Sequence, residues 1–294
     1  MRSKLGVGTV QFGMDYGVSN TGGRTPQQEV REILDVAATA GLVVIDTAPA
    51  YGDSESVIGN TITPGHAFRI VTKIPKIAGK TIGTQTRNLV KRTFDRSLEN
   101  LNCASVYGLL VHDANDLLKD GAEELMETLY EFRSQGRVAK VGVSVYDATE
   151  IDAIVGRFPI DLIQLPVSII DQRLLKSGHL ARMAAGNVEI HSRSAFLQGL
   201  LLMKKGSWPE RFRPFFPLLN RFHEFAEQRN LTPLQIALGF VQSISEVSQI
   251  ICGTNSAAQM RELVDGTAIN LDLDECRSLA VDDIDLVDPR FWVN

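Results

Sequence analysis

The sequence predicts an α/β protein that folds as a (β/α)8 TIM barrel, a single domain over residues 1–294. Short apolar runs alternate with stretches of helical periodicity, and no linker or low-complexity tract interrupts them. The runs are continuously apolar, which is typical of strands buried on both faces of a parallel sheet. Eight such runs occur, and eight strand–helix units close most economically into a barrel. A doubly wound open sheet has the same periodicity and stays the alternative.

The expected strands follow one another at regular spacing along the chain. They cover residues 5–8, 42–45, 68–72, 106–111, 138–143, 162–165, 188–190 and 249–252, of which 188–190 has the weakest pattern. Between them, apolar side chains recur at helical spacing, for example over residues 90–101, 122–129 and 151–155. Strands that alternate with helices in this way predict a parallel sheet.

The first long helix is predicted together with both of its ends. Thr25 is expected to cap the N-terminus, with Pro26 at the first helical position and Gln28 completing a capping box. Gly41 is expected to end the helix as a C-terminal cap. The apolar stripe between these ends consists of Val30, Ile33, Leu34, Ala37 and Ala38.

Two capping boxes, Thr232 to Gln235 and Ser256 to Gln259, predict further helices late in the chain. Before them, the aromatic-rich and basic segment 209–217 is expected to form an irregular loop over one barrel face. Its aromatic side chains either line a substrate pocket or pack the loop on the barrel; they are Trp208, Phe212, Phe215 and Phe216. The neighbouring pair Lys204 and Lys205 either approaches a cofactor phosphate or stays solvated.

Composition and charge favour a protein that acts on a small molecule. The formal net charge is -5, and an acidic surface attracts neither nucleic acid nor an anionic membrane, so we expect neither partner. Cys103, Cys252 and Cys276 are widely separated and lack zinc-ligand spacing, so we expect no metal and no disulfides. No signal-peptide or transmembrane pattern is visible near the N-terminus, and we expect a cytoplasmic protein.

Four polar residues follow the ends of predicted strands. Asp46, Lys73 and His112 each come directly after an apolar run, and Tyr51 lies in the loop after Asp46. Active sites of barrels form at the carboxyl ends of the strands, so we expect these four side chains to meet at one mouth.

Together these groups suit the reduction of a carbonyl by hydride. The carbonyl oxygen develops negative charge and needs a proton, which a tyrosine can supply. The ordinary pKa of tyrosine is about 10, and the ammonium of Lys73 would lower the pKa of Tyr51 toward neutrality. Asp46 would hold Lys73 in an ion pair, and His112 would donate a hydrogen bond to the substrate oxygen.

At these residues the sequence resembles the aldo-keto reductase family. The resemblance begins with Asp46-Thr47-Ala48-Pro49-Ala50-Tyr51-Gly52 and extends over essentially the whole chain. Its other motifs are Gly8-Thr9, Ser54-Glu55, Gly59, Thr72-Lys73, Val111-His112-Asp113, Gly142-Val143-Ser144, Gln164, Gln198-Gly199-Leu200-Leu201 and Gly253-Thr254-Asn255.

The resemblance implies a nicotinamide cofactor that lies across the barrel mouth, and a catalytic tetrad of Asp46, Tyr51, Lys73 and His112. The implied cofactor-binding residues are Gly8, Thr9, Asp46, Ser144, Gln164, Arg193, Ser194, Gly253, Thr254, Asn255 and Gln259. In keeping with the resemblance, the sequence has no GxGxxG fingerprint. Instead, the helix capped by Ser256 is expected to offer free backbone N–H groups to a phosphate. From the family we expect NADPH in preference to NADH.

The sequence departs from the family pattern at the cofactor. Val145 replaces the asparagine that usually follows the serine, and Arg193 falls where an aromatic residue usually stacks on nicotinamide. Gly253 and Gln259 replace the basic residues that often bind the 2'-phosphate. Arg193 is expected either to stack on the nicotinamide or to reach an anionic group of the substrate.

The function expected from the residues and the resemblance is NAD(P)H-dependent reduction of an aldehyde, ketone or sugar. The partner is then a small-molecule carbonyl substrate, and the protein is a monomer or a small homo-oligomer. Two alternatives are a nicotinamide-binding regulatory or sensor barrel with little turnover, and an aldolase that forms a Schiff base on Lys73.

Overall fold

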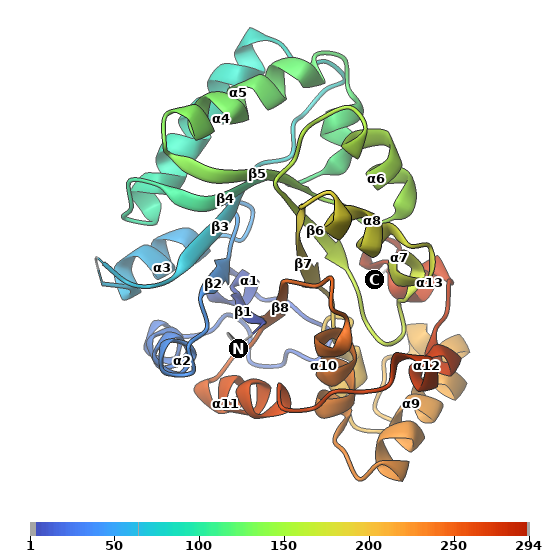
Figure 1. Ribbon diagram of the computed structural model, residues 1–294. Coiled ribbons are helices and arrows are strands. Elements are labelled where there is room, and N and C mark those ends of the chain that lie inside the picture. The colour runs from blue at the N-terminus through green and yellow to red at the C-terminus, as the bar shows by residue number, and fades with distance from the viewer. Residues whose placement is uncertain (1–3, 64, 293–294) are drawn as a thin grey trace.

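Eight parallel strands form a closed barrel in which each strand pairs with the next along the chain, and β8 pairs with β1 (Figure 1). The computed structural model describes residues 4–63 and 65–292. The strands are β1 (Leu5–Gly8), β2 (Val44–Asp46), β3 (Arg69–Ile74), β4 (Val106–Val111), β5 (Val138–Ser144), β6 (Leu162–Pro166), β7 (Glu189–Arg193) and β8 (Gln249–Gly253). Closure confirms the predicted barrel and excludes the open doubly wound sheet.

Every predicted strand is present, with ends that shift by a few residues. The largest shifts are in β2, which begins at Val44 rather than at residue 42, and in β7, which continues to Arg193 rather than ending at residue 190. Strand β7 carries polar side chains at its end, which is why apolar periodicity underestimated its length. The extension is functionally relevant because Arg193 now ends a barrel strand.

The core has two parts. A small cluster inside the barrel joins side chains of five strands, Val44, Val71, Leu110, Leu162 and Ile251. A much larger cluster lies between the strands and the surrounding helices. Burial of apolar surface at about 25 cal/mol per Å² makes this second layer the main source of stability.

Helices surround the barrel and cover its outer face (Figure 1). The α-helices are α1 (Val10–Gly13), α2 (Gln27–Thr39), α3 (Ser54–Thr61), α4 (Thr84–Asn100), α5 (Ala122–Ser134), α6 (Ala148–Val155), α7 (Arg173–Lys176), α8 (His179–Ala185), α9 (Phe216–Gln228), α10 (Pro233–Ser243), α11 (Ala257–Gly266), α12 (Leu273–Cys276) and α13 (Ile284–Val287). Short 3-10 helices occur at Ala114–Leu118, Leu200–Leu202, Glu210–Phe215, Arg277–Leu279 and Pro289–Phe291. No helix in the described ranges is long and apolar enough to cross a membrane.

Helix α2 begins differently from the prediction. Its N-cap is Pro26, whose side chain makes no capping hydrogen bond, so the capping box of Thr25 and Gln28 is wrong. The Thr25 hydroxyl is buried and has no partner among the described residues, while the backbone N–H of Thr25 donates to the carbonyl of Gln11. The other end is confirmed: Gly41 has φ +74, and its N–H donates to the carbonyl of Ala38.

Of the two later capping boxes, only the first is complete. Thr232 and Gln235 exchange both hydrogen bonds at the start of α10. At α11, Ser256 accepts from the N–H of Gln259, but the Gln259 side chain accepts from Asn255 instead of Ser256. The second box is therefore half formed.

The predicted loop over residues 209–217 is wrong. The segment folds as the 3-10 helix Glu210–Phe215 and the first residues of α9, because proline is tolerated in the first turn of a helix. Its aromatic side chains pack: Trp208 lies 5.3 Å from Phe216 between ring centroids, and Phe212 lies 5.0 Å from Trp292. None of the aromatic residues of this segment lines the large cavity described below. Lys205 forms an ion pair with Glu224 on α9.

Candidate active site

The carboxyl ends of the strands open into a cavity of about 1170 Å³. Its lining includes the predicted site residues Gly8, Thr9, Asp46, Tyr51, His112, Ser144, Gln164, Arg193, Ser194, Gly253, Thr254, Asn255 and Gln259. Lys73 is the exception, since its side chain lies behind the wall and has no exposed surface. The structure thus brings together residues from seven strand ends around one cavity, with Lys73 from β3 buried next to it.

A buried ion pair lies behind the cavity wall. The Lys73 ammonium donates to both oxygens of Asp46, at 2.8 and 2.9 Å, and to the carbonyl of Thr47 at 3.0 Å. Burial acts to lower the pKa of Lys73, but the charge and hydrogen bonds of Asp46 and the neighbouring Tyr51 outweigh it and raise the pKa. Lys73 is therefore a fixed positive charge, since all three of its N–H groups have partners.

Tyr51 lies next to this charge. The Lys73 nitrogen is 5.1 Å from the centroid of the Tyr51 ring, which is a cation–π contact. Burial of the phenol raises the pKa of Tyr51 above its usual value, although the charge of Lys73 acts to lower it. We expected the ammonium to lower the pKa toward neutrality. That expectation is wrong for the net shift, because desolvation of the phenolate is the larger effect.

His112 lies on the other side of Tyr51. The two ring centroids are 5.9 Å apart at 86°, which is an edge-to-face contact. Burial, followed by the charge of Lys73, lowers the pKa of His112 to about 4. The imidazole is therefore neutral near pH 7 and has one N–H to donate.

Two glycines fix the loop that carries Tyr51. Gly52 has φ +59, a conformation that favours glycine, and a Cβ on Gly52 would overlap the carbonyl oxygen of Gly13. A Cβ on Gly13 would in turn overlap the carbonyl oxygen of Tyr51. Helix α1 and the Tyr51 loop are thus in backbone contact. Ser54 adds a buried link, since its hydroxyl donates to the Thr9 carbonyl at 2.9 Å.

Gln164 partly serves the ion pair. Its Nε2 donates to Oδ1 of Asp46 at 2.7 Å, so one end of this amide is already engaged. Glu55 accepts from the hydroxyl of Thr72 at 2.7 Å. Asp113 likewise pairs with Lys76 and caps the following 3-10 helix through the N–H of Asn115.

Arg193 lies flat on an aromatic ring. Its guanidinium carbon is 4.0 Å from the centroid of the Tyr146 ring, and Nη2 donates to the carbonyl of Val145 at 3.0 Å. A longer contact of 3.4 Å joins Nη1 to the hydroxyl of Ser194. The side chain is thereby fixed at the cavity wall.

The start of α11 differs from the prediction. We expected free backbone N–H groups there, but the N–H of Asn255 donates to Gln259, and the N–H of Ala257 donates to the carboxylate of Glu29 at 2.6 Å. The N–H of Ser256 is directed to the hydroxyl of Thr254 at 3.3 Å. These amides are used by the protein itself, so they do not offer the open phosphate site that was predicted.

The charged side chains at the start of α11 and on its cavity side are negative, whereas Arg261 of the same helix is not part of the cavity lining. Glu29 lies at its N-terminus, and Glu262 and Asp265 line the cavity further along the helix. Within the described part of the chain, Arg193 is the single lysine or arginine of the cavity lining. No group of three or more His, Cys, Asp or Glu residues in that part is arranged to hold a metal ion.

The model of the Aldo/keto reductase family matches residues 4–281 of this chain. The chain belongs to the aldo/keto reductase family. It is therefore an oxidoreductase of a family that acts on carbonyl compounds with nicotinamide cofactors.

Individual relatives are distant. Aldo-keto reductase YhdN of Bacillus subtilis (strain 168) is 25% identical over 182 residues, which is 60% of this chain and 53% of that protein. The chain thus matches about half the length of that relative. The NADH-specific methylglyoxal reductase of Escherichia coli (strain K12) is 24% identical over 305 residues, which is 92% of this chain and 91% of that protein.

Solved structures share the fold. The holo form of aldo-keto reductase AKR11C1 from Bacillus halodurans has a TM-score of 0.76 at 18% identity, over 99% of this chain and 95% of that chain. The glycerol dehydrogenase AKR11B4 from Gluconobacter oxydans has a TM-score of 0.73 at 19% identity, over 98% and 93%. At these identities the likeness concerns the barrel architecture alone.

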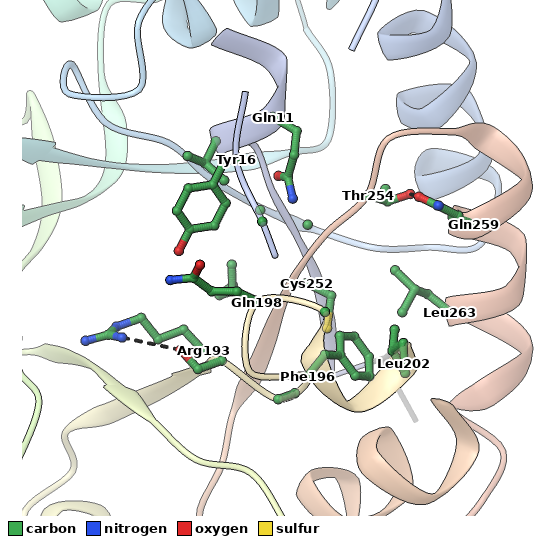
Figure 2. Close-up of a pocket in the computed structure, with 18 of the residues that line it drawn as sticks. Gln11, Tyr16, Arg193, Phe196, Gln198, Leu202, Cys252, Thr254, Gln259 and Leu263 are labelled. Atoms are coloured by element: carbon green, nitrogen blue, oxygen red, sulfur yellow. Dashed lines mark hydrogen bonds between the residues drawn. The ribbon is translucent and has the colours of Figure 1, made fainter. Parts of the chain in front are cut away.

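Sequence reasoning missed several cavity residues of this aldo/keto reductase. Figure 2 shows Tyr16 and Gln198 on the same side of the cavity as the predicted Arg193. Leu263 lies on the other side, with the predicted Thr254 and Gln259. Tyr16, Gln198, Gln11 and Tyr146 follow strand ends, so the rule that barrel sites use these loops could have found them. Glu29 gave no such signal, because it reaches α11 from a helix more than 200 residues away in sequence.

Proposed function

We propose that this aldo/keto reductase reduces the carbonyl of an aldehyde, ketone or sugar by hydride transfer, with Tyr51 as the proton donor. The observation that carries the proposal is the position of the Tyr51 phenol at the cavity wall, with the buried pair of Lys73 and Asp46 directly behind it. A nicotinamide bound in the cavity supplies the hydride.

The residues provide the proton and stabilise the charge that its loss creates. Addition of hydride to the carbonyl carbon leaves negative charge on the oxygen, which takes the proton of Tyr51. The fixed ammonium of Lys73 then stabilises the tyrosinate, and Asp46 keeps the ammonium in place. Neutral His112 donates its N–H to the same oxygen and orients it.

The raised pKa of Tyr51 suits a reductase. Burial keeps the phenol protonated at neutral pH, so the acid is present before the substrate binds. The low pKa of His112, about 4, keeps a second positive charge away from Lys73. Both shifts favour donation of hydrogen bonds from neutral groups.

The cavity fits a nicotinamide cofactor. Gly8 and Gly253 both line the cavity, and their main chains lie close together, since a Cβ on Gly8 would lie 3.2 Å from the Gly253 nitrogen. The Oε1 atom of Gln11 is buried next to Gly253 and has no partner among the described residues, so it can accept from a ligand. Ser144 and Gln164 would face the carboxamide.

The family resemblance and this chain's own residues favour different cofactors. The resemblance predicts NADPH, whose 2'-phosphate needs positive charge or free N–H groups. The α11 region instead has Glu29, Glu262 and Asp265, and its first amides already have acceptors. We therefore propose that NADH binds at least as tightly as NADPH, and titration of the protein's fluorescence with each nucleotide tests this.

The aldolase alternative loses support. A lysine that forms a Schiff base has to reach the substrate as a neutral amine. The Lys73 side chain has no exposed surface, does not line the cavity and has a raised pKa. The regulatory alternative differs from the enzyme only in turnover and is decided by assay.

The decisive experiment is oxidation of NADH and NADPH with a panel of neutral and charged aldehydes, ketones and sugars. We expect turnover by the wild-type protein and its loss in Tyr51→Phe, while nucleotide affinity is retained. Equal rates for both proteins would overturn the assignment of Tyr51. Tight nucleotide binding without turnover of any carbonyl would favour the regulatory barrel.

A further inference from the structure

Arg193 lies at the end of the cavity that holds the proposed proton donor. It lines the same cavity as Tyr51, His112 and Tyr16. Its charge acts to lower the pKa of each of these three groups, although burial is the larger effect on each, so the guanidinium lies within electrostatic reach of all of them. A ligand whose carbonyl approaches Tyr51 therefore passes through the field of Arg193.

The guanidinium is held by a stack of two cations on one ring. Arg193 and Arg290 lie 4.0 and 3.8 Å from the centroid of the Tyr146 ring, too close to share one face. Glu150 locks the stack, since it accepts from the Tyr146 N–H at 2.6 Å and from Nη1 of Arg290 at 2.9 Å. Arg193 is thus held on a rigid support rather than on a flexible loop.

The two arginines differ in their counter-charges. Arg290 forms ion pairs with Asp288 at 2.6 Å, Glu150 at 2.9 Å and Asp147 at 3.7 Å. Arg193 forms no ion pair with any carboxylate in residues 4–63 and 65–292. The acid of this end of the cavity, Asp46, is already engaged by Lys73 and Gln164.

A half-buried cation without a counter-charge is costly unless an anion joins it. The protein has provided acids for Arg290 on the far face of the same ring, and none for Arg193. Tyr16, Tyr51 and neutral His112, which line the same cavity, can each donate a hydrogen bond. Charge and donors together favour a ligand that brings a negative group.

We propose that the carbonyl substrate carries an anionic group, a carboxylate or a phosphate, and that this group binds the guanidinium of Arg193. The inference rests on the proposed function, because it places the carbonyl of the same molecule at Tyr51. Arg193 then selects the substrate, and the tetrad reduces it. Tyr16 is the adjacent hydroxyl that shares the anion.

Pairs of carbonyl compounds that differ only in charge test the proposal. Succinic semialdehyde is compared with butanal, and glyceraldehyde 3-phosphate with glyceraldehyde, to separate the carboxylate from the phosphate. In the wild type we expect a higher kcat/KM for the charged member of at least one pair. A charge-assisted hydrogen bond contributes enough for Arg193→Gln to lower that kcat/KM by roughly 10- to 100-fold. For the neutral members, which have no anionic group to bind Arg193, the kcat/KM of Arg193→Gln should differ from that of the wild type by less than about 3-fold.

Two further variants serve as references. Arg193→Lys keeps the charge without the planar group and should recover part of the preference. Arg277→Gln removes an exposed arginine that pairs with Asp274 far from the cavity lining, and it should leave all substrates unchanged. Nucleotide affinity is measured for every variant.

Succinate binding gives a readout that does not need turnover. We expect succinate or inorganic phosphate to raise the melting temperature of the nucleotide-bound wild type, and this shift to be absent in Arg193→Gln. Equal losses for charged and neutral substrates, together with weaker nucleotide binding, would assign Arg193 to the cofactor and overturn the proposal. Anion binding lost in Arg193→Gln by a protein that reduces no carbonyl would support the anion site and overturn the proposed function alone.

Discussion

The two ends of the cavity treat charge in opposite ways. At the end that holds Tyr51 and His112, here called the strand end, the Lys73 ammonium is buried in an ion pair. A second cation at this end, Arg193, has no acid as partner among the described residues. At the end next to α11, here called the α11 end, the charged side chains are acidic. The carboxylate of Glu29 accepts from the Ala257 N–H, which could otherwise bind a phosphate. The strand end can therefore accept negative charge that develops or arrives there, whereas the first amides of α11 already have acceptors within the protein.

This difference teaches where the specificity of the protein lies. Unpaired polar groups indicate a ligand, because burial without a partner costs free energy that the fold alone does not recover. Polar groups that are paired within the protein indicate a structural role instead. Arg193 departs from the family pattern and has no acid as partner among the described residues, so substrate choice should depend more on it than on the nucleotide region.

The largest effect should come from removing the proton at the strand end. Tyr51→Phe deletes the proposed general acid, and such groups contribute roughly 10²- to 10⁴-fold to the rate. We expect kcat to fall by that factor in a stopped-flow assay of nucleotide oxidation, with an unchanged dissociation constant for NADH. A loss of nucleotide affinity of the same size would show instead that the phenol supports the cavity rather than the reaction.

The buried pair should be the next most sensitive point. Asp46→Asn leaves the Lys73 ammonium buried without its counter-charge, which typically costs about 3–5 kcal/mol of unfolding free energy. Urea denaturation of the variant measures this loss. The double variant Asp46→Asn with Lys73→Met removes the orphaned charge and should recover part of the stability but no activity. If the single variant is as stable as the wild type, the pair is not a buried charge interaction.

His112 should make the free energy of unfolding depend on pH. Its pKa is lowered to about 4 in the folded protein, while the unfolded chain takes up the proton near pH 6.5. The unfolded state then binds more protons between these values, so the contribution of His112 is fully present above about pH 6.5 and is lost as pH falls toward about 4. Unfolding free energies of wild type and His112→Gln, measured at pH 7, 5.5 and 4.5, should converge as pH falls. A constant difference would rule out a depressed pKa.

The smallest effect should come from the α11 end. Glu29→Gln keeps an acceptor for the Ala257 N–H and removes one negative charge at the helix N-terminus, where a charge contributes about 0.3–1 kcal/mol. We expect NADPH to bind roughly 2- to 5-fold tighter, and NADH to be unchanged. Glu32→Gln, on the same helix but exposed and paired with Gln28, is the matched control. If both variants behave alike, only general surface charge is involved.

Much of the fold could be predicted because it depends on local patterns. Apolar runs located all eight strands. Four of the five residues of the predicted stripe in α2, from Val30 to Ala37, are buried as expected, whereas Ala38 is exposed. The segment 209–217 failed because its prolines indicated a loop, although proline also suits the first turn of a helix such as α9. The length of β7 failed because its last residues are polar and carry no apolar pattern.

The site was predicted in its composition but less well in its energetics. Strand ends placed Asp46, Lys73 and His112 together, and the cavity includes nearly all the expected residues. Burial is not visible in a sequence, so the net rise in the pKa of Tyr51 could not be foreseen. Glu29 reaches Ala257 only because barrel closure brings the first and last thirds of the chain together.

The contact between Gly13 and Gly52 has a consequence for redesign. The proposed proton donor, Tyr51, lies in a loop whose position depends on two residues without side chains, because the main chains of Gly13 and Gly52 meet with no space for even one methyl group. Substitution of the residues around the Tyr51 ring can change the pKa of the phenol. Moving the phenol to another position would require a different backbone at the contact between Gly13 and Gly52. The most restrictive positions around the reaction centre are thus ones that take no chemical part in it.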